Sequence, residues 1–155
     1  NLGGFAFYLG ETSQISLTWW NLNHGDTRKL SYIKLQDLYR GAGDQGQYPF
    51  IKNMSLSKSA ALSPGEEVRI EIEVSRESEN IAYAYLASTE IDSDLVEDPN
   101  DRIPLSADAD GCKAVIKAPD NPGLYRIYAV LSDRDNRYTS TLSRTIRVQG
   151  GRASD

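Results

Sequence analysis

One turn and the strand after it constrain the fold of this chain more than any other stretch. The turn is Asp120-Asn121-Pro122-Gly123, in which Pro122 fixes φ and Gly123 tolerates a positive φ, so the chain reverses direction there. In the residues that follow, apolar side chains occupy every second position: Tyr125, Ile127, Ala129 and Leu131. Arg126 falls on the opposite face, because successive side chains of a strand point to opposite sides. We therefore predict a strand at the centre of a β-fold.

Several other stretches also predict short strands. The clearest is Glu67 to Val74, where charged and apolar residues alternate without error, so one face should be buried and the other solvated. Further strands are expected at residues 50–56, 81–88, 112–118 and 138–148, with a shorter one at 103–107 and turns at 75–80, 108–111 and 132–137. Short strands at intervals of about ten residues are typical of a sandwich.

The order Asp120, Gly123, Tyr125, then an apolar residue two positions on, resembles the tyrosine corner of immunoglobulin-like sandwiches. This resemblance implies a mainly β chain, with an immunoglobulin or fibronectin type III-like β-sandwich of about seven strands over residues 49–149. Tyr83 or Tyr85 stands where an immunoglobulin domain has a buried Trp. Residues 150–155 are expected to be a disordered tail.

Residues 1–48 predict a separate strand–strand–helix segment. Residues 3–10 form an apolar run between glycines, which indicates a buried strand, and residues 15–20 form a second extended stretch. Asp26 or Thr27 can cap a helix that continues to about Arg40 with a broad apolar face, and Gly41 supplies its end. Residues 44–48 are polar and glycine-rich, which favours a linker.

Two groups of motifs resemble the C-terminal part of a bacterial glycoside hydrolase. Residues 4–10 (GFAFYLG), 18–20 (TWW) and 35–41 (LQDLYRG) resemble the last strand, loop and helix of its (β/α)₈ barrel. Residues 62–66 (LSPGE) and 122–126 (PGLYR) resemble turns of the immunoglobulin-like module that follows such barrels. The chain departs from the pattern at Leu9, where a sugar-lining Trp is expected, and it lacks the earlier strands that carry the catalytic carboxylates.

The resemblance implies a non-catalytic accessory module of a secreted, periplasmic or cell-surface polysaccharide-degrading protein. The module would act as a spacer, a stabiliser of the barrel or a weak glycan binder. An alternative is the C-terminal portion of an active glycoside hydrolase that contributes one wall of the substrate cleft. The first residue, Asn1, also suggests a piece excised from something larger. The expected partners are a polysaccharide or the rest of a larger parent protein.

Carbohydrate binding would use aromatic rings that stack on sugars and nearby polar groups. The candidates are Tyr8, Glu11, Trp19 and Trp20, and, on strands of the sandwich, Tyr128 and Tyr138. Tyr128 is included because it shares the outer-face parity of Arg126. The alternative interpretation is that these rings cover the junction between the two segments. Glycoside hydrolysis needs two carboxylates at a set separation across a cleft, and the earlier barrel strands that would supply them are absent, so we predict no catalytic residues within this chain. Glu11 is the best single candidate, because it follows the barrel-like strand where active-site loops lie, with a plain turn residue as the alternative interpretation.

A long acidic loop between residues 90 and 104 raises the possibility of calcium. Its candidate ligands are Asp92, Asp94, Asp98 and Asp101. Calcium takes six or more oxygen ligands, so a cluster of carboxylates is compatible with a calcium-dependent adhesion-type module as a second alternative. A solvated acidic loop is the alternative interpretation.

Composition excludes other classes of function. The net charge of −5 argues against a nucleic-acid partner, which requires clustered Lys and Arg. No run of 18 apolar residues exists, so no membrane-spanning helix is expected. One cysteine, Cys112, and one histidine, His24, cannot build a zinc site, and a nucleophilic dyad between them is not expected. We therefore predict no cofactor other than calcium.

Overall fold

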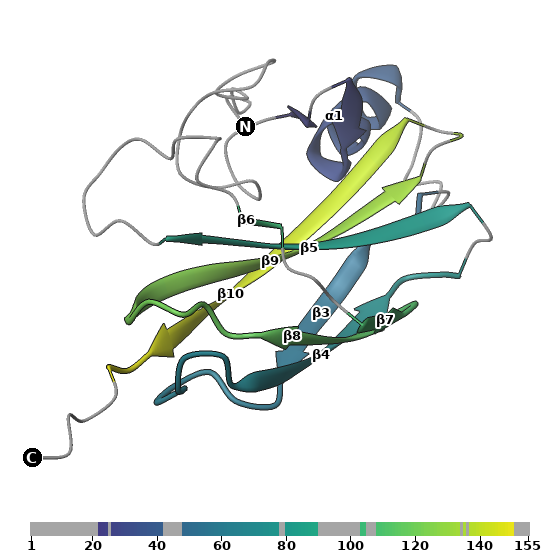
Figure 1. Cartoon of the computed structure of the whole chain (residues 1–155). Helices are drawn as coiled ribbons and strands as arrows, with labels where there is room; N and C mark the ends of the chain where they lie inside the picture. The colour runs from purple at the N-terminus through teal and green to yellow at the C-terminus, as the bar shows by residue number, and fades with distance from the viewer. Residues whose placement is uncertain are drawn as a thin grey trace, which may run out of the picture.

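The computed structural model describes residues 22–24, 26–41, 48–77, 80–89, 103–104, 108–133, 135 and 137–150, and within these the chain is mainly β with one helix (Figure 1). The elements, in chain order, are β1 (Asn23–His24), β2 (Thr27–Lys29), α1 (Leu30–Arg40), β3 (Ile51–Leu56), β4 (Glu67–Val74), β5 (Ile81–Thr89), β6 (Ile103–Pro104), β7 (Asp108–Asp110), β8 (Lys113–Lys117), β9 (Gly123–Asp133) and β10 (Tyr138–Val148). The predicted strands and tail at residues 3–10, 15–20 and 151–155 lie outside the described residues.

The larger sheet has six strands in the order β1-β2-β10-β9-β5-β6. Strand β9, which carries the sequence after the Pro122 turn, pairs antiparallel with β10 on one side and with β5 on the other. The predicted central position of this strand is therefore confirmed. Strand β2 joins the same sheet by pairing parallel to β10, so residues 27–29 and the helix after them are attached to it.

The smaller sheet has four antiparallel strands in the order β3-β4-β8-β7. Strand β4 confirms its predicted alternation, because its apolar side chains at Val68, Ile70 and Ile72 are buried while the charged ones between them are exposed. On the outer face, the Lys113 ammonium lies 3.6 Å from the Glu71 carboxylate across the β4–β8 pair. Both groups are well exposed, so this ion pair adds little stability.

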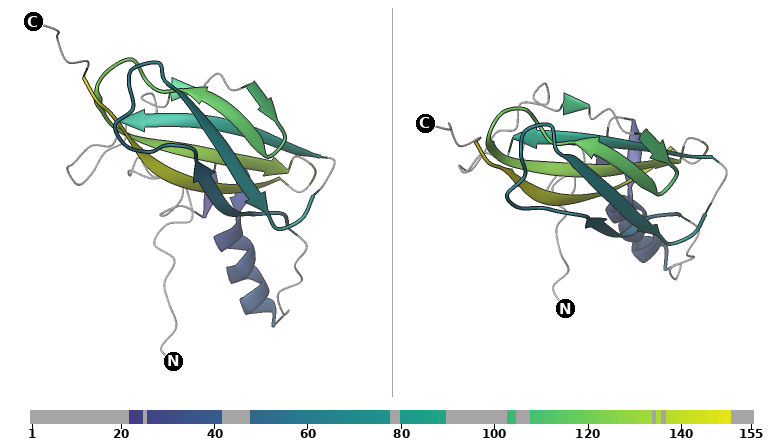
Figure 2. Two further views of the ribbon diagram at one scale, coloured as in Figure 1. Left: turned by 90° about the horizontal axis from the view of Figure 1, so that it is seen from below. Right: turned by 60° about the horizontal axis from the view of Figure 1, so that its bottom comes forward.

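The two sheets face each other across one apolar core (Figure 2). The core takes residues from both sheets: Val68, Ile70, Ile72, Ala114 and Ile116 from the smaller one, and Tyr85, Ala87, Tyr125, Ile127, Ala129, Leu131 and Ile146 from the larger one. The predicted corner is also present, because the Tyr125 hydroxyl donates a hydrogen bond of 2.8 Å to the Asn121 carbonyl oxygen. This bond ties the turn to the strand that starts from it.

The helix begins later than its sequence predicts. We expected Asp26 or Thr27 to cap it, but α1 starts at Leu30 after Lys29, which makes no side-chain capping bond. The reason is that residues 27–29 pair with β10 as a strand, and the Thr27 hydroxyl lies 2.6 Å from that of Thr139 instead of facing a helix terminus. The predicted end is confirmed, since Gly41 has a left-handed φ of 65° and its N–H bonds to carbonyls of the last turn.

The predicted turn at residues 108–111 is wrong for its first three residues. Asp108–Asp110 form strand β7, which pairs antiparallel with β8. The free backbone edge of β8 explains the difference, because an antiparallel neighbour satisfies N–H and C=O groups there. Only the short turn at Gly111, with a φ of +56°, keeps the predicted character.

Candidate functional site

Helix α1 is attached to one end of the six-stranded sheet by the segment that precedes it. Besides the contact between Thr27 and Thr139, the Arg28 N–H donates to the Arg137 carbonyl oxygen at 2.8 Å. The Arg137 guanidinium in turn donates to the Asp26 carbonyl oxygen at 3.2 Å and to its carboxylate at 2.9 Å. These bonds fix the start of the helix relative to β10.

The helix buries only part of its apolar face. Ile33 is buried in the core, and Leu30 and Tyr32 pack partly against it. In the last turn, by contrast, Leu38 is 73% exposed and Tyr39 is 79% exposed. Figure 2 shows why, since α1 runs away from the two sheets so that its C-terminal half projects from them. Leu38 and Tyr39 are the large apolar side chains that stand exposed among the described residues, which makes this end of α1 a candidate binding surface.

A groove of about 310 Å³ runs beside these exposed residues. Its lining is mostly apolar, and Gln36 and Arg40 are the two polar side chains in it. The lining residues are Leu22, Tyr32, Leu35, Gln36, Tyr39 and Arg40. The Arg28 guanidinium carbon lies 5.3 Å from the centre of the Tyr32 ring, a cation–π contact that holds this ring in place. Aromatic rings beside an amide and a guanidinium can contact either an apolar protein surface or the face of a sugar ring. We call the groove and the exposed Leu38 and Tyr39 the α1 surface.

The sequence does not reveal the α1 surface, because helical spacing places all the large apolar residues of the helix on one broad apolar face and does not separate the buried from the exposed part of it. A signal was present in the sequence. Six large apolar or aromatic residues within the span 30–39 are more than a short helix can bury against one neighbour, since the core-facing stripe covers only part of its circumference. The surplus at Leu38 and Tyr39 is the part that the structure leaves exposed.

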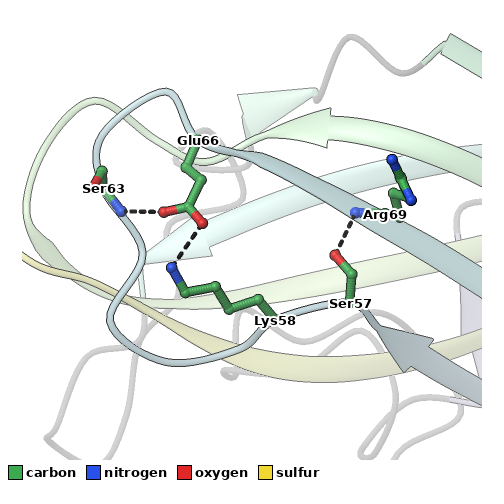
Figure 3. A network of polar contacts seen from close by, with 5 residues as sticks. All are labelled: Ser57, Lys58, Ser63, Glu66 and Arg69. Atoms are coloured by element: carbon green, nitrogen blue, oxygen red, sulfur yellow. Dashed lines mark hydrogen bonds and ion pairs between the residues drawn. The ribbon is translucent and has the colours of Figure 1, made fainter.

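A second polar cluster lies in the turn between β3 and β4 (Figure 3). The Glu66 carboxylate accepts hydrogen bonds from the Lys58 ammonium at 2.7 Å and from the Ser63 N–H at 2.8 Å. The bond from Lys58 and then the one from Ser63 lower the pKa of Glu66 below its ordinary value of 4.5. Gly65 adopts a φ of +70° in the same turn, and its N–H bonds to the Ala118 carbonyl oxygen. Each partner is thus used to hold the turn, which gives the cluster a structural role.

Eight of the residues predicted from sequence as ligand contacts lie outside the part of the chain that the structure describes. Tyr8, Glu11, Trp19 and Trp20, the carbohydrate candidates, lie outside the described residues. The same is true of the calcium candidates, Asp92, Asp94, Asp98 and Asp101. These assignments remain predictions.

The sugar-stacking role suggested for Tyr128 and Tyr138 is wrong. Both side chains are fully buried. Tyr138 packs in the core, with its ring centre 5.2 Å from that of Tyr48. Tyr128 forms a second buried cluster with Val130 and Leu86, so β9 is covered on both faces there rather than solvated on one. Strand parity gives the face on which a side chain lies, but it does not reveal what covers that face.

Within the part of the chain that the structure describes, no three His, Cys, Asp or Glu side chains gather as a metal site would require. Among the same residues, no helix has the length and hydropathy needed to cross a membrane. Cys112 is half-buried, with its sulfur 3.6 Å from the Tyr83 hydroxyl. The α1 surface is the arrangement in the described residues with the character of a binding site.

Comparison with known proteins does not assign a family. No family model matches the chain, and no curated protein matches it. Among solved structures, it is similar to PcoC, a methionine-rich copper resistance protein from Escherichia coli, with 16% identity over 66% of this chain and 99% of that one, at a TM-score of 0.37. A selenomethionine form of PcoC is 18% identical over 61% of this chain and 99% of that one, at a TM-score of 0.31. Likenesses this weak carry no functional argument.

Proposed function

We propose that this chain is a non-catalytic, immunoglobulin-like accessory module of a secreted, periplasmic or cell-surface polysaccharide-degrading protein. The module stabilises and spaces a neighbouring domain of that protein, which packs on the α1 surface. The observation that carries this proposal is the exposure of Leu38 and Tyr39 on a helix that β2 attaches to the sheet. The resemblance of residues 35–41 to the last helix of a glycosidase barrel supports it, because such a helix packs on its barrel.

The free energy available from burying Leu38 and Tyr39, together with the fixed start of α1, favours a folded domain as the partner. Burying a Leu or a comparable apolar side chain stabilises a contact by about 1.5–3 kcal/mol, so Leu38 and Tyr39 would together contribute a few kcal/mol. The anchored start of α1 means that a bound domain would take a fixed orientation relative to both sheets. A spacer or stabiliser needs this property, whereas a flexible tether would not supply it.

The experiment compares the isolated chain with the larger parent protein that contains it. Replacing Leu38 and Tyr39 with Glu should lower the melting temperature of the parent protein by several degrees, because the interface loses apolar contact and gains two charges. The isolated chain should keep its melting temperature, since both side chains are exposed there. Val115→Glu, at a half-buried position on the outer face of β8, is the matched control. A parent protein that melts at the same temperature with Leu38 and Tyr39 replaced would contradict the proposal.

Glycan binding is a second candidate, favoured by the Tyr32, Gln36, Tyr39 and Arg40 side chains along the groove. A glycan array probed with the isolated chain would test it, with Tyr39→Ala, Trp19→Ala and Trp20→Ala variants. Loss of binding in Tyr39→Ala alone would place the sugar on the α1 surface. Loss of binding in the Trp variants alone would support Trp19 and Trp20, the residues predicted from sequence. No binding by the unsubstituted chain would rule out glycan binding.

A calcium-dependent adhesion module and the wall of an active glycosidase cleft remain as alternatives. The first depends on Asp92, Asp94, Asp98 and Asp101, and the second on Tyr8, Glu11 and Trp19. A melting temperature that is equal in calcium and in chelator would end the calcium alternative. Unchanged turnover in a parent glycosidase carrying Tyr8→Ala or Glu11→Ala would end the other.

A further inference from the structure

The outer face of the six-stranded sheet is buried over the half that lies nearest to β2. Tyr128 and Thr139 are fully buried there, and Val130 and Lys29 are nearly so. The pairing of β2, β10 and β9 places all four side chains on the face turned away from the smaller sheet, because the residues that alternate with them in β9 fill the core. We call this area the outer patch.

The sheet by itself does not bury the outer patch. In the described part of the chain, the apolar side chain that packs with Tyr128 and Val130 is Leu86, which lies directly opposite Tyr128 on β5. Side chains of one sheet stand side by side and roughly perpendicular to it, so they shield one another's flanks but not their tips. On the outer face of the smaller sheet, the charged side chains of β4 are exposed. The outer patch is therefore covered by a further layer of chain.

The limits of the outer patch indicate where this layer comes from. Towards the end of β10, Thr145 and Arg147 lie on the same face and are exposed. The covered half is the one that β2 joins, and the described chain begins beside it. Leu22 is buried, and its carbonyl oxygen accepts a hydrogen bond of 2.8 Å from the Lys29 N–H. The residues that precede Leu22 therefore start at the edge of the outer patch.

The composition of these residues suits an apolar surface. In residues 15–20 (ISLTWW), Ile15, Leu17 and Trp19 occupy every second position, so an extended chain places them on one side. Residues 90–102, which follow β5, carry six carboxylates instead. Packing these carboxylates against Val130 and Tyr128 would be unfavourable, because a buried charge needs a partner.

The length of residues 15–20 also fits. Three strand spacings separate β2 from β5 in the sheet order, which corresponds to about 14 Å. Six extended residues span about 20 Å. Residues 15–20 can therefore cross β10 and β9 and reach Leu86.

We propose that the outer patch is the docking surface for residues 15–20 of the same chain, with Ile15, Leu17 and Trp19 packed on it. Trp20 then faces away from the sheet, because neighbouring side chains of an extended segment point to opposite sides. Of the two tryptophans, Trp20 is the ring left open to a ligand, and Trp19 is part of the packing. No residue of the outer patch lines the α1 surface, so this docking does not depend on the proposed function.

Tryptophan fluorescence of the full chain tests this arrangement, because Trp19 and Trp20 are its only tryptophans. In the Trp20→Phe protein, Trp19 should emit at shorter wavelength and be quenched by acrylamide several-fold less than Trp20 is in the Trp19→Phe protein. Adding Val130→Glu to Trp20→Phe should move the Trp19 emission to longer wavelength. Val115→Glu, at a half-buried position on the outer face of β8, is the matched control and should leave the emission unchanged.

Photo-crosslinking gives a second readout that leaves the outer patch intact. The photoreactive residue p-benzoylphenylalanine is placed at Ser143, which is half-buried and lies directly opposite Tyr128. Peptide mass spectrometry should find cross-links to residues 15–20 within one chain, whereas the same residue at Val115 should give none to that segment. Cross-links from position 143 to residues 90–102 or to a second copy of the chain would overturn the proposal. Equal quenching of Trp19 and Trp20 would also overturn it.

Discussion

Tyr125 shows how one side chain holds a corner of this fold. Its ring is buried between the sheets while its hydroxyl donates to the Asn121 carbonyl oxygen at 2.8 Å. The Pro122-Gly123 turn lies between these two points, so a single hydrogen bond closes the loop that leads into β9. Glu66 acts in the same way at the β3–β4 turn, where one carboxylate pairs with Lys58 and with the Ser63 N–H.

We predict that Tyr125→Phe lowers the free energy of unfolding by about 1 kcal/mol, the usual net value of such a hydrogen bond. The ring stays in the core, so the loss reports on the hydroxyl alone. Urea unfolding followed by circular dichroism would measure it. Tyr39→Phe, which removes an exposed hydroxyl, should leave the unfolding midpoint unchanged. A Tyr125→Phe protein as stable as the wild type would show that the corner does not depend on this bond.

The lowered pKa of Glu66 predicts how the stability of the folded chain depends on pH. Its pKa is lower in the folded chain than the ordinary value of 4.5, so the folded state favours the charged form. The resulting stabilisation is present above the unfolded pKa and is lost as the pH falls through the lower folded pKa. We expect Glu66→Gln to make the loss of stability between roughly pH 5 and pH 3 shallower than in the wild type. Melting temperatures across this range would test it, and an unchanged slope would be evidence against it.

At the scale of elements, the sequence predicts strands better than it predicts their neighbours. Glu67–Val74 and Tyr138–Val148 were predicted at the bounds that the structure has, because strict alternation and flanking turns are local signals. The start of α1 was missed because residues 27–29 pair with β10, which lies more than a hundred positions away. The strand at Asp108–Asp110 is not predicted for a similar reason, since it forms by pairing antiparallel with the edge of β8. Local propensity does not report such pairings.

The attachment of α1 to the sheet can be tested at Thr139, which is fully buried beside Thr27. Thr139→Val keeps the shape of the side chain and removes the hydroxyl that lies 2.6 Å from that of Thr27. Hydrogen exchange measured by mass spectrometry should become faster in residues 26–40 and stay unchanged in β9. Thr145→Val, at an exposed position of the same strand, is the control. Equal exchange of residues 26–40 in all three proteins would show that the hydroxyl pair does not hold the helix.

At the scale of the whole molecule, two sheets enclose one core and carry the helix at one end (Figure 1). The turn with Glu66 lies at the end of the sheets away from α1, so the bonds that hold the corners are separated from the α1 surface (Figure 1). This surface could not be located from sequence, because Leu38 and Tyr39 have the same character as the residues of a buried helix face. Only the direction of α1 relative to the sheets reveals that no described neighbour covers them.

The central claim is that the α1 surface contacts another domain of a larger polysaccharide-degrading protein. Hydroxyl-radical footprinting of Leu38 and Tyr39, in the isolated chain and in the intact parent protein, tests it most directly. Val115, on the outer face of β8, serves as an internal reference that stays equally accessible in both. We expect Leu38 and Tyr39 to be oxidised readily in the isolated chain and several-fold more slowly in the parent protein. Equal oxidation of these two residues in both proteins would contradict the account.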